Sequence, residues 1–397
     1  MGSDNKLVQF KECRILRDHN IINEDLWVRN GKIVNPEKIF FDEKITADTV
    51  IHCKNNIIAP GFIDLQINGG YGYDFSFEDK TEEAISVVGK KLLSHGVTSY
   101  CPTVVTSSVE VYHKILSKFK RKEGGLHGAT VLGTHVEGPF INPNKKGAHR
   151  ASFIRSYEQV NDISVIEETY GSLENVQIIT LAPEFPNSGS VIKYLTNRNI
   201  IVSLGHSTSH LSEAEEAVRH GASLITHLFN AMLPFHHRDP GLVGLLASHN
   251  IPRSIYYGII SDHVHTDPAA LRIAYRVNPR GLVLVTDAIS ALGLYEGEHK
   301  IGPLNMEIRD QKAYIQGTDT IAGSMASMIE CIQFFMSATG SPPEYALEAA
   351  SLHPAEVLGI QKQKGTLNFD ADADFVILND TFDIQSTWIA GERVFSI

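Results

Sequence analysis

Apolar runs rich in β-branched residues alternate with segments of helical spacing through most of this chain, and this alternation constrains the fold more than any other feature. The segments between the runs carry apolar residues three or four positions apart, as at Ile85, Val88 and Leu92. Eight such βα units predict a parallel (β/α)8 TIM-like barrel, with a doubly wound open sheet as the alternative. The predicted strands span residues 57–66, 97–105, 130–137, 176–182, 200–206, 223–230, 255–262 and 281–287.

Both ends of the chain have a different pattern, in which short strands follow one another without helices between them. Asn30-Gly31 is a strong hairpin signal near the start, and apolar runs at 373–378 and around Trp388 stand near the end. Because chain ends often lie close together, we expect both ends to pair into one small β-sandwich. The predicted division is 1–58 with 364–397 for this small β domain and 59–363 for the barrel domain.

The overall composition excludes two classes of partner. The formal net charge of -11 argues against a nucleic-acid or anionic-membrane surface, since both need a dominant positive field. No apolar run approaches the ~20 residues of a membrane span, and residues 1–6 lack the apolar core of a secretion signal. Four scattered cysteines without a CxxC pair predict isolated reduced thiols. We therefore expect a cytoplasmic protein.

Three predicted strands end in a residue that can bind a metal ion. Glu137 ends the third strand, His206 the fifth and His227 the sixth. Taken singly, Glu137 is better explained as a loop carboxylate paired with a lysine, and each histidine as a packed or hydrogen-bonded core residue. The C-terminal ends of barrel strands meet at one mouth, so together the three residues predict a site for one divalent ion. This ligand set suits Zn²⁺ best, although ligand type alone also permits Fe²⁺, Co²⁺ or Mn²⁺.

Asp287 ends the eighth predicted strand and faces the same mouth. A buried carboxylate is costly unless it is paired, hydrogen-bonded or beside a metal ion. We expect Asp287 to act as a general base toward a water and then as a general acid toward a leaving amine. The alternative is a structural aspartate that holds a loop N–H group.

Several motifs together resemble the amidohydrolase superfamily and, within it, the N-acetylglucosamine-6-phosphate deacetylase family. The similarity covers nearly the whole chain, and its most specific parts are Glu-Gly-Pro-Phe at 137–140 and His-Leu-Phe-Asn-Ala-Met at 227–232. One departure concerns the His-x-His motif that most superfamily members carry on strand one, where this chain has Gln66 and Asn68. Amides are poor ligands beside imidazole, so we expect one metal ion, with a weakly occupied second site as the alternative.

The resemblance also implies substrate contacts. Arg238 looks like the phosphate-binding arginine of the family, which related enzymes supply across a homodimer interface, and a guanidinium fork suits phosphate geometry. Asn230 and Ala231 come shortly after His227, so their backbone N–H groups are expected to reach a phosphate or sugar oxygen. His149 resembles a residue that orients the sugar or amide, and His265 lies in the matching strand-seven loop. Taken without the resemblance, both histidines would be solvated loop residues.

The activity that the resemblance implies is hydrolysis of the acetamide of N-acetyl-D-glucosamine 6-phosphate to D-glucosamine 6-phosphate and acetate. One alternative is another amidohydrolase, such as a cyclic-amide hydrolase or a deaminase. Cyclic-amide hydrolases often use a carbamylated lysine on strand four, and residues 176–182 contain no lysine. The other alternative is a barrel that has lost its chemistry, against which the joint presence of Glu137, His206, His227 and Asp287 argues.

Overall fold

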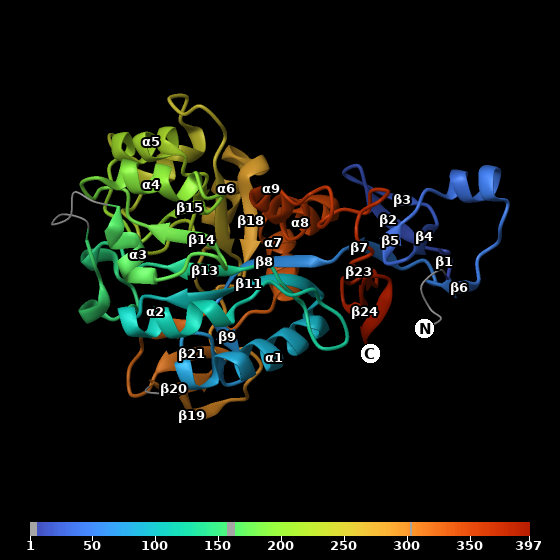
Figure 1. Cartoon of the computed structure of the whole chain (residues 1–397), viewed down its shortest axis with the longest axis horizontal. Coiled ribbons are helices and arrows are strands. Elements are labelled where there is room, and N and C mark those ends of the chain that lie inside the picture. The colour runs from blue at the N-terminus through green and yellow to red at the C-terminus, as the bar shows by residue number, and fades with distance from the viewer. Residues whose placement is uncertain (1–5, 157–162, 302–303) are drawn as a thin grey trace.

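The larger part of the molecule is a parallel barrel, seen in the computed structural model, which describes residues 6–156, 163–301 and 304–397 (Figure 1). Neighbouring strands pair in sequence order, and every pair is parallel. The last strand returns to the first, where Asp287 N–H donates to Gln66 O at 2.8 Å. The predicted (β/α)8 architecture is therefore confirmed. The barrel strands are β8 (Phe62–Ile67), β11 (Val97–Val105), β13 (Thr134–Glu137), β14 (Val176–Leu181), β15 (Ile201–Leu204), β16 (Leu224–Ile225), β17 (Tyr256–Ile260) and β18 (Leu282–Val285).

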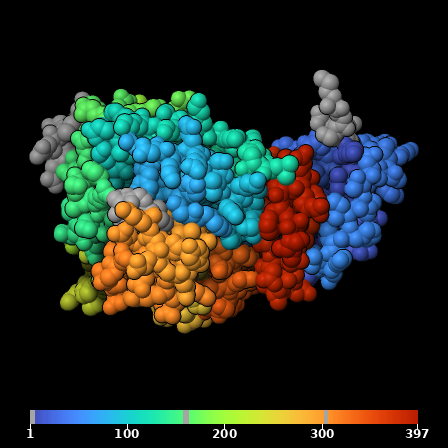
Figure 2. All heavy atoms as spheres, turned by 90° about the horizontal axis from the view of Figure 1, so that it is seen from below, coloured from blue at the N-terminus to red at the C-terminus, as the bar shows by residue number. Residues whose placement is uncertain are grey.

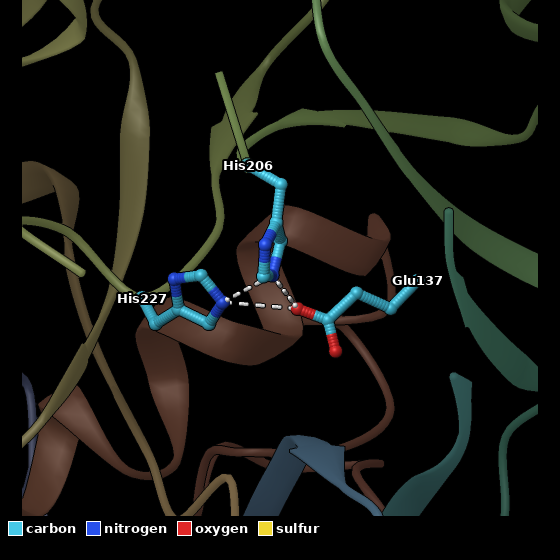
Figure 3. Close-up of side chains that lie close together, drawn as sticks. All are labelled: Glu137, His206 and His227. Atoms are coloured by element: carbon cyan, nitrogen blue, oxygen red, sulfur yellow. Dashed lines mark hydrogen bonds and ion pairs between the residues drawn. The ribbon is translucent and has the colours of Figure 1, made fainter. Parts of the chain in front are cut away.

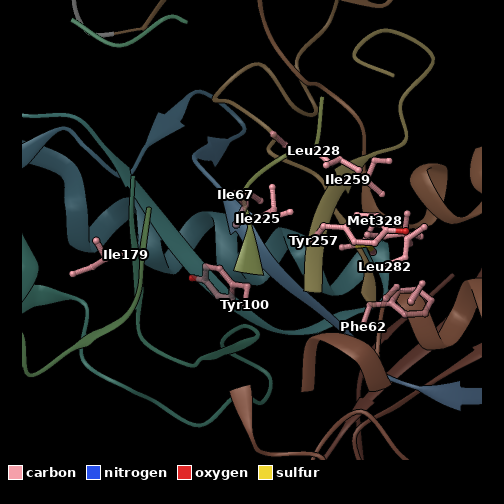
Figure 4. Close-up of a cluster of buried hydrophobic side chains, with 14 of the residues drawn as sticks. Phe62, Ile67, Tyr100, Ile179, Ile225, Leu228, Tyr257, Ile259, Leu282 and Met328 are labelled. Atoms are coloured by element: carbon pink, nitrogen blue, oxygen red, sulfur yellow. The ribbon is translucent and has the colours of Figure 1, made fainter. Parts of the chain in front are cut away.

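Helices cover the outside of the barrel and bury the outer face of its strands (Figure 1). A strand buried on both faces is mostly apolar along its length, which explains the nearly continuous apolar runs in the sequence. Phe62, Tyr100, Tyr257, Leu282 and Met328 belong to the resulting core (Figure 4). The helices are α1 (Thr81–Leu92), α2 (Val109–Ile115), α3 (Ser164–Tyr170), α4 (Ser188–Thr196), α5 (Leu211–His220), the 3₁₀ helix η7 (Gly241–Ala247), α6 (Pro268–Val277), α7 (Met328–Thr339), α8 (Pro343–Ala349) and α9 (Leu352–Leu358).

The two chain ends meet in one six-stranded sheet, with the order β25-β24-β23-β7-β2-β3. A four-stranded sheet, β5-β4-β1-β6, packs against it through a cluster that includes Phe10, Phe375 and Trp388. In Figure 2 the C-terminal residues, in red, lie between the barrel and the N-terminal strands, in blue. The strands are β1 (Val8–Lys11), β2 (Arg14–Arg17), β3 (Asn20–Asn23), β4 (Leu26–Arg29), β5 (Lys32–Ile33), β6 (Thr49–His52), β7 (Ile57–Pro60), β23 (Phe375–Leu378), β24 (Ile384–Ile389) and β25 (Glu392–Ser396).

The structure corrects three sequence predictions about strands. The run 57–66 holds two strands, and β7 belongs to the sheet of the chain ends while only β8 enters the barrel. The run 130–137 is split by Gly133, whose φ of 120° ends β12 (Thr130–Val131) before β13 begins. The run 223–230 forms only the short strand β16, because the backbone turns to positive φ at His227. The division of the chain at 58/59 and 363/364 stays a prediction.

An antiparallel sheet between β18 and α7 was not predicted from the sequence. Its strands are short and mostly half-exposed, so their apolar pattern is weak. The sheet consists of β19 (Gly297–Ile301), β20 (Leu304–Arg309), β21 (Lys312–Ile315) and β22 (Ile321–Gly323), and a small hairpin of β9 (Gly69–Gly70) and β10 (Tyr73–Asp74) follows β8.

The four cysteines are free and buried, but two of them are not isolated. The thiols of Cys13 and Cys53 lie close together, because β1 and β6 pair in parallel and bring both turns together. Across the described residues, no helix has the length and apolarity that a membrane crossing requires.

Candidate metal centre

Three donor atoms from three barrel strands converge at the C-terminal mouth (Figure 3). Glu137 Oε1 lies 3.0 Å from His206 Nε2 and 2.9 Å from His227 Nε2, and the two nitrogens lie 3.0 Å apart. All three residues are buried. The sides of this triangle are close to the edge of about 3.3 Å that tetrahedral ligands at about 2.0–2.1 Å from Zn²⁺ define. The cluster can therefore hold one metal ion.

The backbone turns sharply where the two histidines leave their strands. His206 has a φ of 50° and His227 a φ of 29°, which are uncommon values for residues other than glycine. Strain of this kind is typical of functional sites, where it aims a side chain inward. His206 Nδ1 donates to Lys145 O at 2.7 Å, so its Nε2 carries no proton when the ring is neutral. A bare Nε2 that points at the cluster is the form that binds a metal ion.

The charges in the cluster fit a cation. Burial would raise the pKa of Glu137, but its contacts with His206 and His227 hold that pKa well below its ordinary value. Burial would likewise lower the pKa of His227, whereas the contact with Glu137 raises it to about 9. Two imidazole nitrogens 3.0 Å apart cannot both present lone pairs without a proton or cation between them. The donor set thus favours a positive charge at its centre.

Asp287 lies across the mouth from these donors, at the end of β18, with a φ of 46°. Burial, together with the negative charge of Glu137, raises its pKa to about 6. Asn68 Nδ2 donates to Asp287 Oδ1 at 2.7 Å, and Gln66 Nε2 donates to Glu137 Oε1 at 3.2 Å. The two amides on β8 and just beyond it therefore hydrogen-bond the carboxylates of the site.

His149 lies directly against the cluster. Its ring centroid is 4.5 Å from that of His206, and its Nε2 lies 3.8 Å from Glu137 Oε2. The Thr106 N–H donates to His149 Nδ1 at 3.2 Å, so the proton of the neutral ring is on Nε2. Burial lowers the pKa of His149 to about 3, which keeps the ring neutral. His149 thus presents an N–H donor beside the metal cluster.

The other predicted contact residues lie in the segments that follow β16 and β17. His265 Nδ1 lies 2.6 Å from Asp262 Oδ2, and its pKa is raised, because that contact outweighs burial. The Asn230 N–H already donates to His227 O at 2.9 Å, and the side-chain Nδ2 of Asn230 donates to Leu228 O at 3.3 Å. Ala231 O accepts from Ser207 N–H at 3.1 Å. Arg238 is exposed on a loop and pairs with no carboxylate of the described residues.

Several groups around the site were not found from the sequence. Thr106, the Lys145 carbonyl and Asp262 orient the three histidines at 149, 206 and 265, and none belongs to a motif. Glu184, just past β14, accepts hydrogen bonds from Thr208 N–H at 2.7 Å and Ser207 Oγ at 2.6 Å. The position of Glu184 just after a buried strand was the feature of the sequence that could have indicated its role.

Residues 57–394 match the amidohydrolase family. The chain belongs to the amidohydrolase family. This amidohydrolase is 55% identical over 396 residues to the N-acetylglucosamine-6-phosphate deacetylase of Danio rerio, with 99% of this chain and 98% of the relative covered. The human protein of the same name is 55% identical over 395 residues, with 98% and 96% covered.

Solved structures give the same grouping for the amidohydrolase. A deacetylase variant from Mycobacterium smegmatis in complex with N-acetyl-D-glucosamine-6-phosphate aligns with a TM-score of 0.83 at 27% identity, covering 99% of this chain and 100% of that one. The N-acetylglucosamine-6-phosphate deacetylase of Thermotoga maritima aligns with a TM-score of 0.81 at 27% identity, covering 98% and 100%. Strand β14 carries no lysine, unlike the cyclic-amide hydrolases weighed above.

Proposed function

We propose that this amidohydrolase removes the acetyl group of N-acetyl-D-glucosamine 6-phosphate by hydrolysis, giving D-glucosamine 6-phosphate and acetate. The observation that carries the proposal is the convergence of Glu137, His206 and His227 with Asp287 across the mouth. Deacetylases of this name share 55% of their residues with the chain over nearly its whole length. A cyclic-amide hydrolase or a deaminase has no comparable support.

The proposed ligands are Glu137 Oε1, His206 Nε2 and His227 Nε2. A divalent ion held there supplies Lewis acidity toward the amide carbonyl and a water nucleophile. Asp287 takes the proton of the attacking water, since a pKa of about 6 leaves it largely ionised near neutral pH. Asp287 then returns a proton to the leaving nitrogen, because an amide anion is too basic to depart. His149 donates its Nε2–H to the carbonyl or to a sugar oxygen.

Arg238, His265, Asn230 and Ala231 are the proposed contacts to the rest of the substrate. The raised pKa of His265 favours its charged form, which suits a phosphate or a sugar hydroxyl. The exposed guanidinium of Arg238 is free to reach into the mouth of a second copy, as expected for a homodimer. These assignments explain how an anionic substrate is bound by a chain with a net charge of -11.

The proposed resident ion is Zn²⁺, because two imidazoles with one carboxylate suit a borderline-soft cation. One ion per subunit is expected, since the amides of Gln66 and Asn68 bond Glu137 and Asp287 and are poor ligands for a second ion. A homodimer in the cytoplasm completes the proposal.

Acetate release from a panel of N-acetyl sugars, each with and without a 6-phosphate, tests this function. N-acetyl-D-glucosamine 6-phosphate should be hydrolysed with the highest kcat/KM, and the sugar without phosphate should react poorly through a high KM. An Arg238→Ala variant should lose this preference, and exposed Arg393 offers a matched control for the loss of a surface charge. Equal rates on the sugar with and without its 6-phosphate would show that neither the phosphate nor its contact with Arg238 contributes to substrate selection.

A further inference from the structure

Beneath the metal cluster, the barrel interior holds a chain of hydrogen-bonded side chains to which the proposed reaction assigns no role. Ser203 Oγ lies 2.6 Å from Thr226 Oγ1, and Thr226 Oγ1 lies 2.7 Å from Thr180 Oγ1. Thr180 Oγ1 lies 2.8 Å from His135 Nε2, and His135 Nδ1 lies 3.0 Å from Leu65 O. Each of these residues is at most 2% exposed, so bulk water does not compete for the bonds.

The direction of every bond in this chain is fixed by its last acceptor. The Leu65 carbonyl can only accept, so His135 Nδ1 carries the ring proton and Nε2 of the neutral ring must accept. Thr180 therefore donates to His135, which leaves Thr226 to donate to Thr180. Ser203 in turn donates to Thr226. A chain with one donor direction has no equivalent alternative arrangement, so it holds its members in one geometry.

These hydrogen-bonded side chains lie next to the backbone that carries each of the three proposed metal ligands. Thr226 directly precedes His227, and Thr180 is the β14 partner of Glu137 in the sheet register. Gly205 precedes His206, and a Cβ at Gly205 would lie 2.8 Å from Thr226 Cβ and 3.2 Å from Thr180 Cγ2. The side chains of Thr226 and Thr180 thus pack against the backbone at the turn that leads to His206.

The strand that carries His227 is the one that most needs such support. Strand β16 pairs with each neighbour at only two positions, Leu224 and Ile225. A strand paired at only two positions is weakly held by its backbone hydrogen bonds. The side-chain hydrogen bonds that join Thr226 to Ser203 and to Thr180 therefore add constraints that the backbone lacks. Those bonds cross to β15 and β14, which neighbour the other two donors in the barrel.

We propose that Ser203, Thr226, Thr180 and His135 form a positioning element that sets the spacing of Glu137, His206 and His227 for a single divalent ion. The inference rests on the proposed metal site. Groups that orient metal ligands typically contribute a factor of about 10–100 to metal affinity. The element acts through the ligands and touches neither substrate nor ion.

Co²⁺ binding tests the proposal, with affinity measured by competition against a chelator and geometry by the visible spectrum of the bound ion. Thr226→Val keeps the shape of the side chain but removes both bonds, and should weaken Co²⁺ binding about 10- to 100-fold and change the spectrum. Thr226→Ser keeps the hydroxyl and should restore both readouts. Thr134→Val is the matched control, because Thr134 is also fully buried in a barrel strand but its Oγ1 has no hydrogen-bond partner among the described residues.

The outcomes separate this inference from the metal site on which it depends. A wild-type protein that binds no Co²⁺ overturns both. A Thr226→Val protein with the affinity and spectrum of the wild type overturns the positioning role alone, even if its free energy of unfolding falls. If Thr226→Val does not fold, Ser203→Ala removes only the first donor and should weaken Co²⁺ binding by a smaller factor, and an unchanged affinity there contradicts the proposal.

Discussion

Asn68 Nδ2 donates to Asp287 Oδ1 at 2.7 Å, so an amide side chain just beyond β8 hydrogen-bonds the proposed general base. Burial raises the pKa of Asp287, and this hydrogen bond opposes the shift by stabilising the charged form. Asn68→Ala should therefore raise the pKa of Asp287 further. Because the base must be ionised, the acidic limb of the kcat/KM profile should move to higher pH. If the acidic limb does not move and the metal content is unchanged, then the ionisation that produces this limb is not that of Asp287.

Asp287→Asn should abolish most turnover while leaving substrate binding intact. The amide keeps the shape of the side chain but cannot take a proton, and general acid–base groups typically contribute about 10²- to 10⁴-fold. The rate should be measured as kcat, and binding of N-acetyl-D-glucosamine 6-phosphate by calorimetry. Near-normal kcat would assign the proton transfers to another group. Asp310→Asn is the control, because it makes the same chemical change at an exposed turn between β20 and β21.

Glu137→Gln should release the metal ion and lose activity together. The amide removes the negative charge that holds the pKa of His227 high and that compensates a bound cation. Metal content by mass spectrometry should fall below one ion per chain, and added Zn²⁺ should restore activity to chelator-treated wild type but not to the variant. Glu392→Gln, at an exposed position, should keep both properties. A chelator-treated wild type that stays fully active would remove the ion from the reaction.

Lys364 ties the sheet of the chain ends together, and its removal should destabilise the protein strongly. Lys364 Nζ lies 2.7 Å from Asp374 Oδ2 and 2.9 Å from Asp372 Oδ2, and the lysine and Asp374 are both buried. Lys364→Ala leaves a buried carboxylate without its partner, a change that typically costs about 3–5 kcal/mol. Urea unfolding monitored by circular dichroism measures this loss. Lys362→Ala, two residues earlier and exposed, should change stability little.

The sequence predicted the barrel and the cluster because both depend on local patterns. Buried parallel strands need continuous apolar runs, and the C-terminal end of each run marks where Glu137, His206, His227 and Asp287 emerge. The polar residues inside the strands gave no such signal. Thr180 and Thr226 look like ordinary β-branched strand residues until their neighbours across the barrel are known.

Other features depend on contacts between distant segments and could not be read from the chain alone. Gly61 separates β7 from β8, but whether residues 57–60 join the barrel or the chain-end sheet is decided by β2 and β23, the strands that pair with β7. Thr106 holds His149 from 43 positions away, with no shared motif. The thiols of Cys13 and Cys53 meet for the same reason, through the pairing of β1 with β6.

An anomalous-difference map from crystals of the purified protein, recorded on both sides of the zinc absorption edge, tests the central claim most directly. The account predicts one strong peak per chain within bonding distance, about 2.0–2.2 Å, of Glu137 Oε1, His206 Nε2 and His227 Nε2, with Asp287 facing it. A map with no peak among these atoms, or with its main peak beside Gln66 and Asn68, would contradict the account.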